Sequence, residues 1–284
     1  MPNAFTSKSD LLTYLHQFYR EDADRTIRFL DPLYDEPLTP GRIPRCIAED
    51  PQCQLGFQRL ETVVRTSGLE VQLILRPHGS AEDWADIVHD HGDLLNPAIL
   101  VAIESDWTAT RNALGEYNDP IPVVSPPLDG GRAKFTEAQV RWFAENDKLA
   151  LPCDIDSPVE GLRKQLLKLF AISEELDVEA GFSPREVHKF QAIARGAYHC
   201  IREWGMIGQL GYWLNRLAAC DALPLALTIP CIMGSDHEPL AEKLTLLGIS
   251  TTSYKQKKLD TDGELFVSML QNCALLPELL HEES

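Results

Sequence analysis

The sequence predicts a three-layer α/β fold with a mainly parallel sheet, an N-terminal helical arm, and a helical insert between the fourth and fifth strands. Short β-rich runs, beginning with LEVQLILRP at 69–77 and AILVAI at 98–103, are each followed by a polar break and then by a helical pattern. Strands that alternate with helices in this way favour parallel pairing through βαβ crossovers, with both faces of the sheet covered.

The chain opens with a predicted amphipathic helix at residues 9–20, where apolar residues recur at helical spacing behind a Ser/Asp start. The next stretch, DPLYDEPLTPGRIPRC at 31–46, is rich in proline, which cannot continue a helix and does not pair inside a sheet. We therefore expect an arm at 1–50, followed by a further helix that leads into the first strand.

Four more strands are predicted after the first two. They are IPVV at 121–124, LALPC at 149–153, LPLALTIPCIM at 223–233 and STTSYKQ at 250–256. Helical patterns fill almost all of residues 158–222, which defines the insert and divides the α/β domain into 51–157 and 223–284. The motif Gly205-x-x-Gly208-x-x-Gly211 lies between helices instead of after a strand, so it indicates close helix packing or a turn, not a dinucleotide site.

The charge balance limits the partners that the chain can bind. Its net charge of −17 repels phosphate backbones, which argues against direct, non-specific nucleic-acid binding. Residues 78–119 hold nine acidic side chains against the single Arg111. This region is either a solvated face that keeps the protein soluble or an interaction face for a partner with a basic surface. In the second case we expect Asp83, Asp86 and Asp90 to take part.

Neither a membrane nor an oxidising compartment is indicated. The N-terminus has no apolar block behind a basic stretch, and no segment approaches the roughly 18 uninterrupted apolar residues that a membrane span needs. The seven cysteines are odd in number and contain no C-x-x-C pair, so we expect reduced and mostly buried thiols, including Cys153 and Cys231 at strand ends. A cytoplasmic protein follows from these features.

Ligands of open α/β sheets bind outside the carboxyl ends of the strands. This rule nominates polar residues that follow the predicted strands, and a small-molecule ligand there would meet Arg76, His78, Ser125, Ser235, Asp236 and His237. Carboxylates at the same edge have the oxygen ligands that Mg²⁺ prefers. The candidate metal ligands are Glu104, Asp106 and Asp154, and we expect Asp156 and Asp236 at the same edge.

Asp154-Ile155-Asp156 has two interpretations. Asp154 and Asp156 are the candidate catalytic residues of a metal-dependent enzyme, or they are the polar start of an ordinary helix. Residues such as Asp106, Asp156 and Asp236 stand where helix N-caps are expected, and a cap accepts hydrogen bonds from unpaired backbone N–H groups. The helix start is the interpretation that we favour.

The order of motifs in residues 149–270 also resembles the haloacid dehalogenase family of phosphohydrolases. The shared features are an apolar strand ending in D-x-D, a helical insert, an apolar strand with a hydroxyl residue, and a helix followed by LLGIS. The resemblance implies that Asp154 is the nucleophile, that Asp156 is the general acid/base, and that Mg²⁺ bridges carboxylate and phosphate. It also implies roles in phosphate and metal binding for Ser235 or Thr228, Lys255 or Lys257, and Asp260 or Asp262. The family has Gly-Thr where this chain has Ser157-Pro158.

Two function classes follow. The first is a binding subunit of a larger assembly, which engages a partner or ligand through the acidic region and the proline-rich arm. The second is a metal-dependent hydrolase of a phosphate ester, which uses the carboxylates at the strand ends. We expect the first because each candidate catalytic group also has an ordinary structural role.

Overall fold

The computed structural model describes residues 41–76, 80–104, 130–154, 184–221, 223–224 and 227–255. The chain divides into two compact units, of which one comprises residues 1–50, 157–204 and 260–284 and the other residues 51–156 and 205–259. The first unit contains α2 (Arg45–Ala48) and most of the long helix α8 (Pro184–Ala219). The second, called the sheet unit below, contains every described strand.

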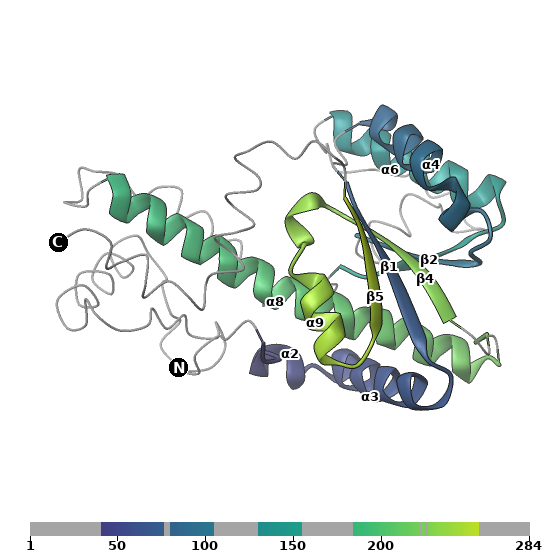
Figure 1. Ribbon diagram of the computed structural model, residues 1–284, viewed down its shortest axis with the longest axis horizontal. Coiled ribbons are helices and arrows are strands. Elements are labelled where there is room, and N and C mark those ends of the chain that lie inside the picture. Colours follow the sequence, from purple (N-terminus) through teal and green to yellow (C-terminus); the bar gives the residue numbers. More distant parts are fainter. Residues whose placement is uncertain are drawn as a thin grey trace, which may run out of the picture. The chain divides into compact units, whose positions relative to one another are not determined.

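The described sheet has five parallel strands in the order β3-β2-β4-β1-β5, which confirms the predicted α/β fold (Figure 1). Its members are β1 (Leu69–Leu75), β2 (Leu100–Ile103), β3 (Leu149–Pro152), β4 (Leu227–Met233) and β5 (Ser250–Lys255). In the central pairing, Leu69 faces Leu227 and Leu75 faces Met233. The predicted strand at 121–124 and the predicted helix at 9–20 lie outside the described residues.

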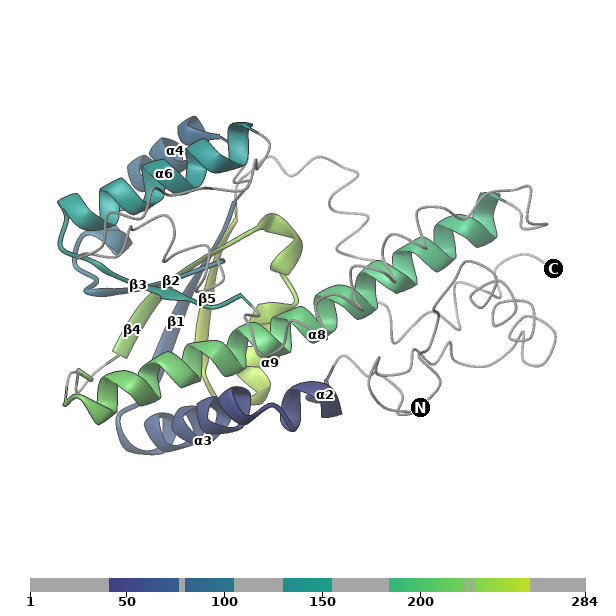
Figure 2. The ribbon, with the colours of Figure 1, turned by 180° about the vertical axis from the view of Figure 1, so that it is seen from behind.

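Helices cover both faces of the sheet, as Figures 1 and 2 show. On one face, α4 (Ala81–Leu95) packs against α6 (Gly130–Glu145). On the other face lie α3 (Pro51–Thr66), α9 (Leu240–Leu246) and residues 205–219 of α8. The connections through α4 and α6 run toward β3, and those through α8 and α9 run toward β5. Crossovers of a single hand require this change of face when the direction reverses.

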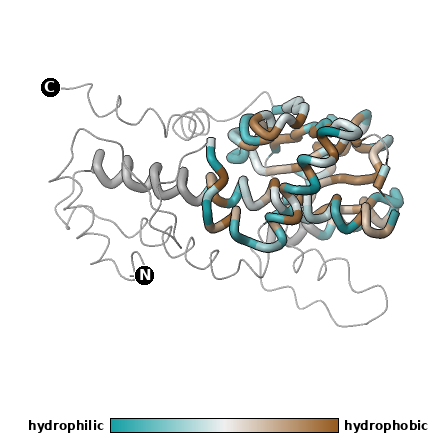
Figure 3. The backbone as a smooth tube through the Cα atoms, turned by 90° about the horizontal axis from the view of Figure 1, so that it is seen from below, coloured by the Kyte–Doolittle hydropathy of each residue, from teal (hydrophilic) through white to brown (hydrophobic). Residues whose placement is uncertain are grey.

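The end of the predicted insert therefore has a structural role in the sheet unit. Residues 205–219 form one of the layers, because Met206, Ile207, Leu210 and Leu214 are buried. Figure 3 shows that hydrophobic residues concentrate along the strands, whereas the helices carry both kinds of residue. No helix within the described ranges is long and apolar enough to cross a membrane.

Aromatic side chains fill the layer between α4, α6 and the sheet. Trp84 of α4 makes edge-on contacts with Phe135 and Trp142 of α6, at ring-centroid distances of 5.8 and 5.7 Å. Phe143 and Ile87 are buried in the same cluster. These rings hold α4 against the sheet by its apolar side, which leaves the opposite side of the helix in solvent.

The helices α3 and α8 approach each other at glycines. A Cβ atom on Gly56 would lie 1.9 Å from the carbonyl oxygen of Gly208, and a Cβ atom on Gly211 would lie 2.2 Å from that of Gly56. Both distances are far below a van der Waals contact, so only hydrogen atoms fit there. The glycine motif at 205–211 thus mediates close helix packing, one of the two roles predicted for it.

Candidate functional site

The carboxyl ends of the five strands meet at one edge of the sheet, called the strand-end edge below. Arg76 follows β1, Glu104 follows β2 and Asp154 follows β3, while Ser235, Asp236 and His237 follow β4. Helices leave neighbouring strands β2 and β4 toward opposite faces, which is the topology of ligand crevices in open α/β sheets. The other candidates at this edge, His78, Asp106, Ser125 and Asp156, lie outside the described residues.

Glu104 connects the ends of β2 and β4. Its Oε2 atom accepts a hydrogen bond of 2.6 Å from the backbone N–H of Gly234, and its Oε1 atom lies 3.4 Å from Nε2 of His237. The side chains of Glu104 and His237 are only 6% and 2% exposed. A carboxylate this far from water depends on such partners. In this structure both oxygens of Glu104 are thus directed at protein groups of the loop after β4.

This geometry bears on the proposed magnesium site. Within the sheet unit, the described His, Cys, Asp and Glu side chains include no group of three whose ligand atoms lie within 4.8 Å of one another. Asp154 is buried, with 9% of the residue exposed, at the end of β3. The described part of the edge therefore holds Glu104 and Asp154 as buried acids but does not assemble them with a third ligand.

The strand order also bears on the resemblance to the phosphohydrolases. Strand β2 lies between β3 and β4, so Asp154 and Ser235 follow strands that are not neighbours. Thr228 is exposed and lies near the amino-terminal end of β4, at the edge opposite Asp154. Thr228 therefore cannot share a phosphate group with Asp154.

The loop after β4 differs from its predicted role as a capping segment. The short helix η2 comprises Ser235–His237, and its N-cap is Gly234, without a side-chain cap. Helix α9 likewise begins after Pro239 without a side-chain cap. The capping role predicted for Asp236 is therefore wrong. The chain turns here through backbone geometry, and Asp236 is exposed to solvent.

The guanidinium group of Arg76 contacts two residues of α4. Its side chain is only 6% exposed and forms an ion pair with Asp90. The same guanidinium nitrogen lies 3.5 Å from the backbone carbonyl oxygen of Asp86, one helical turn earlier on α4. His91 lies beside this pair at a kink of α4, and its ring contacts Tyr254 of β5 edge-on at 5.8 Å. Burial and then the positive charge of Arg76 lower the pKa of His91.

The two cysteines at strand ends are buried, as predicted. Burial, together with the charge of Glu104, raises the pKa of Cys231 to about 12. Burial also raises the pKa of Cys153 well above its ordinary value. Because a thiolate and not a thiol is the nucleophile, neither group is activated for attack at neutral pH.

We therefore expect alkylation to discriminate sharply among the cysteines. Native protein treated with iodoacetamide at mildly alkaline pH should be labelled at Cys220, the exposed member of the six described cysteines. Cys153 and Cys231 should react only after unfolding in urea. Peptide mass spectrometry over time measures each rate. Labelling of Cys231 in the native protein as fast as Cys220 would contradict the buried, protonated thiol.

The acidic side chains of α4 fall into two groups. Asp83 forms a capping box with Ser80, and Asp90 pairs with Arg76, so both have partners within the fold. A second group, called the outer acidic face below, is exposed and forms no ion pair among the described residues; it consists of Glu82, Asp86 and Asp93.

The lysine-rich segment at 255–258 is described only at its start. Lys255, the last residue of β5, forms an ion pair with Glu238, which follows η2. The phosphate-binding role that the resemblance implies for Lys255 would compete with this carboxylate. Lys257, Asp260 and Asp262 lie outside the described residues.

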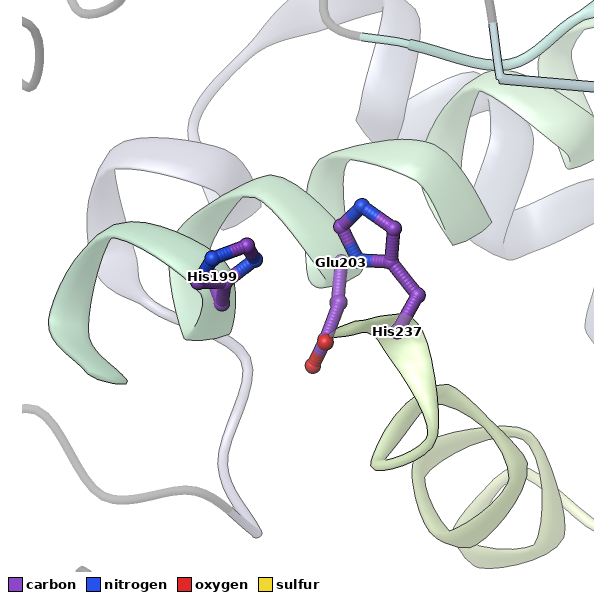
Figure 4. Close-up of side chains that lie close together, drawn as sticks. All are labelled: His199, Glu203 and His237. Atoms are coloured by element: carbon purple, nitrogen blue, oxygen red, sulfur yellow. The ribbon is translucent and has the colours of Figure 1, made fainter. Parts of the chain in front are cut away.

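Two ligand-type residues on α8 were not among the candidates. Figure 4 labels His199 and Glu203 on α8 and His237 on η2. The first two belong to the unit of residues 1–50, 157–204 and 260–284, and His237 belongs to the sheet unit. The sequence signal for this pair is the spacing of four residues inside a predicted helix, because residues four apart are neighbours on the helix surface.

Comparisons of the sequence and the structure with known proteins identify no relative. No protein family, no curated protein and no solved structure matches this chain. The functional argument therefore depends on the residues themselves.

Proposed function

We propose that this protein is a binding subunit, and that the outer acidic face of α4 engages a partner rich in lysine and arginine. The observation that carries the proposal is the division of the α4 acids described above. Asp83 and Asp90 have partners within the fold, although the side chain of Asp90 is itself 47% exposed. Glu82, Asp86 and Asp93 are exposed and form no ion pair among the described residues.

The spacing of the outer acidic face suits a docking surface. Glu82 and Asp86 are four positions apart and share one side of the helix, while Asp93 follows the kink at His91 and extends the exposed acidic surface toward the end of α4. The opposite side of α4, with Trp84 and Ile87, is fixed in the core. These exposed carboxylates are complementary in charge to a basic segment and attract it over about a Debye length.

The strand-end edge supports a binding role more than a hydrolytic one. In the described residues, Glu104 is directed at Gly234 and His237, Arg76 at Asp90, and the two buried thiols have raised pKa values. A metal-dependent hydrolase requires carboxylates that can reach an ion and a substrate. The groups seen here contribute instead to holding the loops of the sheet in place.

The proposal is tested with a fluorescein-labelled oligoarginine peptide as the probe. We expect the triple variant Glu82→Gln/Asp86→Asn/Asp93→Asn to raise Kd about tenfold, because exposed ion pairs contribute up to about 1 kcal/mol each. Fluorescence anisotropy at low and at physiological ionic strength measures Kd. The salt dependence of binding should be weaker in the variant than in the wild type.

A matched triple variant separates the outer acidic face from the net charge of −17. Glu61→Gln/Glu145→Gln/Glu242→Gln removes the same number of charges from exposed positions on α3, α6 and α9. This control should leave Kd within about twofold of the wild type. If both triple variants weaken binding equally, the peptide senses only the overall charge, and the outer acidic face is not the docking surface.

A further inference from the structure

Helix α8 places an imidazole and a carboxylate on one side, one turn apart. His199 and Glu203 are separated by four residues, and such residues lie one above the other on a helix surface. Their ligand atoms lie within 4.8 Å of one another, and Figure 4 shows both side chains on successive turns of α8. Two ligands about 2.0 to 2.2 Å from one ion lie at most about 4.4 Å apart, slightly less than this upper limit, so ion binding draws the two atoms together through rotation of the side chains.

The chemistry of the pair is that of a transition-metal site. An imidazole nitrogen and a carboxylate oxygen are ordinary ligands of Zn²⁺, whereas Mg²⁺ prefers oxygen ligands alone. Pairs of residues at this spacing on a helix bind zinc in metalloproteases for the same geometric reason. Two protein ligands leave the remaining coordination positions to water or to another group.

Burial strengthens the case for a cation. Glu203 is only 1% exposed, which makes it one of the least accessible charged residues described. Moving a carboxylate out of water is costly unless positive charge or hydrogen-bond donors compensate for the lost solvation. A dication next to Glu203 would supply that charge, in addition to the interactions that this residue already has within the protein.

We propose that His199 and Glu203 bind a divalent transition-metal ion, with zinc as the first choice. The site belongs to α8 and uses none of the carboxylates considered as magnesium ligands. It also stands independently of the outer acidic face, so the failure of either proposal leaves the other intact.

The test is calorimetric titration of the full chain with Zn²⁺ after removal of metal by EDTA. We expect one site per chain, and a rise in Tm with Zn²⁺ because the ion binds the folded state selectively. The variants His199→Ala and Glu203→Gln should each raise the Kd for Zn²⁺ by more than about tenfold. Millimolar Mg²⁺ should leave the Zn²⁺ isotherm unchanged, since an imidazole ligand disfavours Mg²⁺.

Two controls make the result decisive. His89→Ala removes an exposed imidazole that lies four residues before Asp93 on α4, and it should leave Zn²⁺ binding unchanged. Far-UV circular dichroism of each metal-free variant shows whether α8 still forms. The absorption spectrum of the Co²⁺-loaded wild type reports the coordination directly. Absence of Zn²⁺ binding by the wild type, or an unchanged Kd in both folded α8 variants, would overturn the proposal.

Discussion

A single methyl group at Gly56 or Gly211 is expected to lower the free energy of unfolding by about 3 kcal/mol, the upper end of the usual range for overpacking. The added Cβ atoms would meet backbone atoms of the facing helix at 1.9 and 2.2 Å. Backbone atoms cannot move aside by changing rotamer, so α3 and α8 would have to separate. Urea denaturation of Gly56→Ala and Gly211→Ala, followed by circular dichroism, measures the loss.

Gly92→Ala is the matched control on another helix. A Cβ atom on Gly92 of α4 would meet only Nδ2 of Asn96, at 3.4 Å, which is close to ordinary contact. Alanine has the higher helix propensity, so this variant should be neutral or more stable by up to about 1 kcal/mol. Equal destabilisation by Gly92→Ala and Gly211→Ala would show that loss of glycine, and not helix approach, causes the effect.

Removal of the Glu104 carboxylate is expected to have the second-largest effect. Glu104→Ala takes away the acceptor of the Gly234 N–H and the group next to the His237 imidazole. A buried polar group that loses its partner costs about 1–3 kcal/mol. Chemical denaturation measures the stability, and hydrogen exchange at the Gly234 amide reports the opening of the loop after β4.

Glu104→Gln distinguishes this structural role from a catalytic one. Glutamine keeps the shape of the side chain and an oxygen that accepts from Gly234, so it should restore most of the stability lost in Glu104→Ala. If Glu104→Gln unfolds as easily as Glu104→Ala, the negative charge beside His237 is the main contribution. If both variants are as stable as the wild type, Glu104 does not hold β2 to β4.

Local patterns were sufficient to predict the five described strands. LEVQLILRP and LPLALTIPCIM became β1 and β4, and even the polar run STTSYKQ became β5. Strand order was not predictable in this way, because β1 pairs with β4 and β5 through contacts between distant segments. The approach of Gly56 to the glycine motif was not predictable for the same reason, because Gly56 is a single glycine within an ordinary helical pattern.

The site was predictable in its residue types but not in its pairing. The strand rule brought Glu104 and His237 to one edge of the sheet, and the structure adds the contacts of Glu104 with His237 and Gly234, which the sequence did not indicate. Arg76 was proposed as a ligand-binding residue, whereas its charge is directed at Asp90 of α4. Sequence patterns identify which polar side chains lie at the strand ends, whereas the three-dimensional packing determines which hydrogen bonds and ion pairs those side chains form.

The position of β1 in the sheet has a consequence for how the chain is made. Both strands that flank β1 are at residues 227–255, far after β1 in the sequence. During synthesis, β1 emerges from the ribosome before either of its partner strands, so its apolar residues and backbone groups have no strand to pair with until residues 227–255 have been translated. Long-range pairing of this kind slows folding and leaves an aggregation-prone strand exposed. We therefore expect β1 to need protection, by a chaperone or by transient non-native contacts, until β4 has been made.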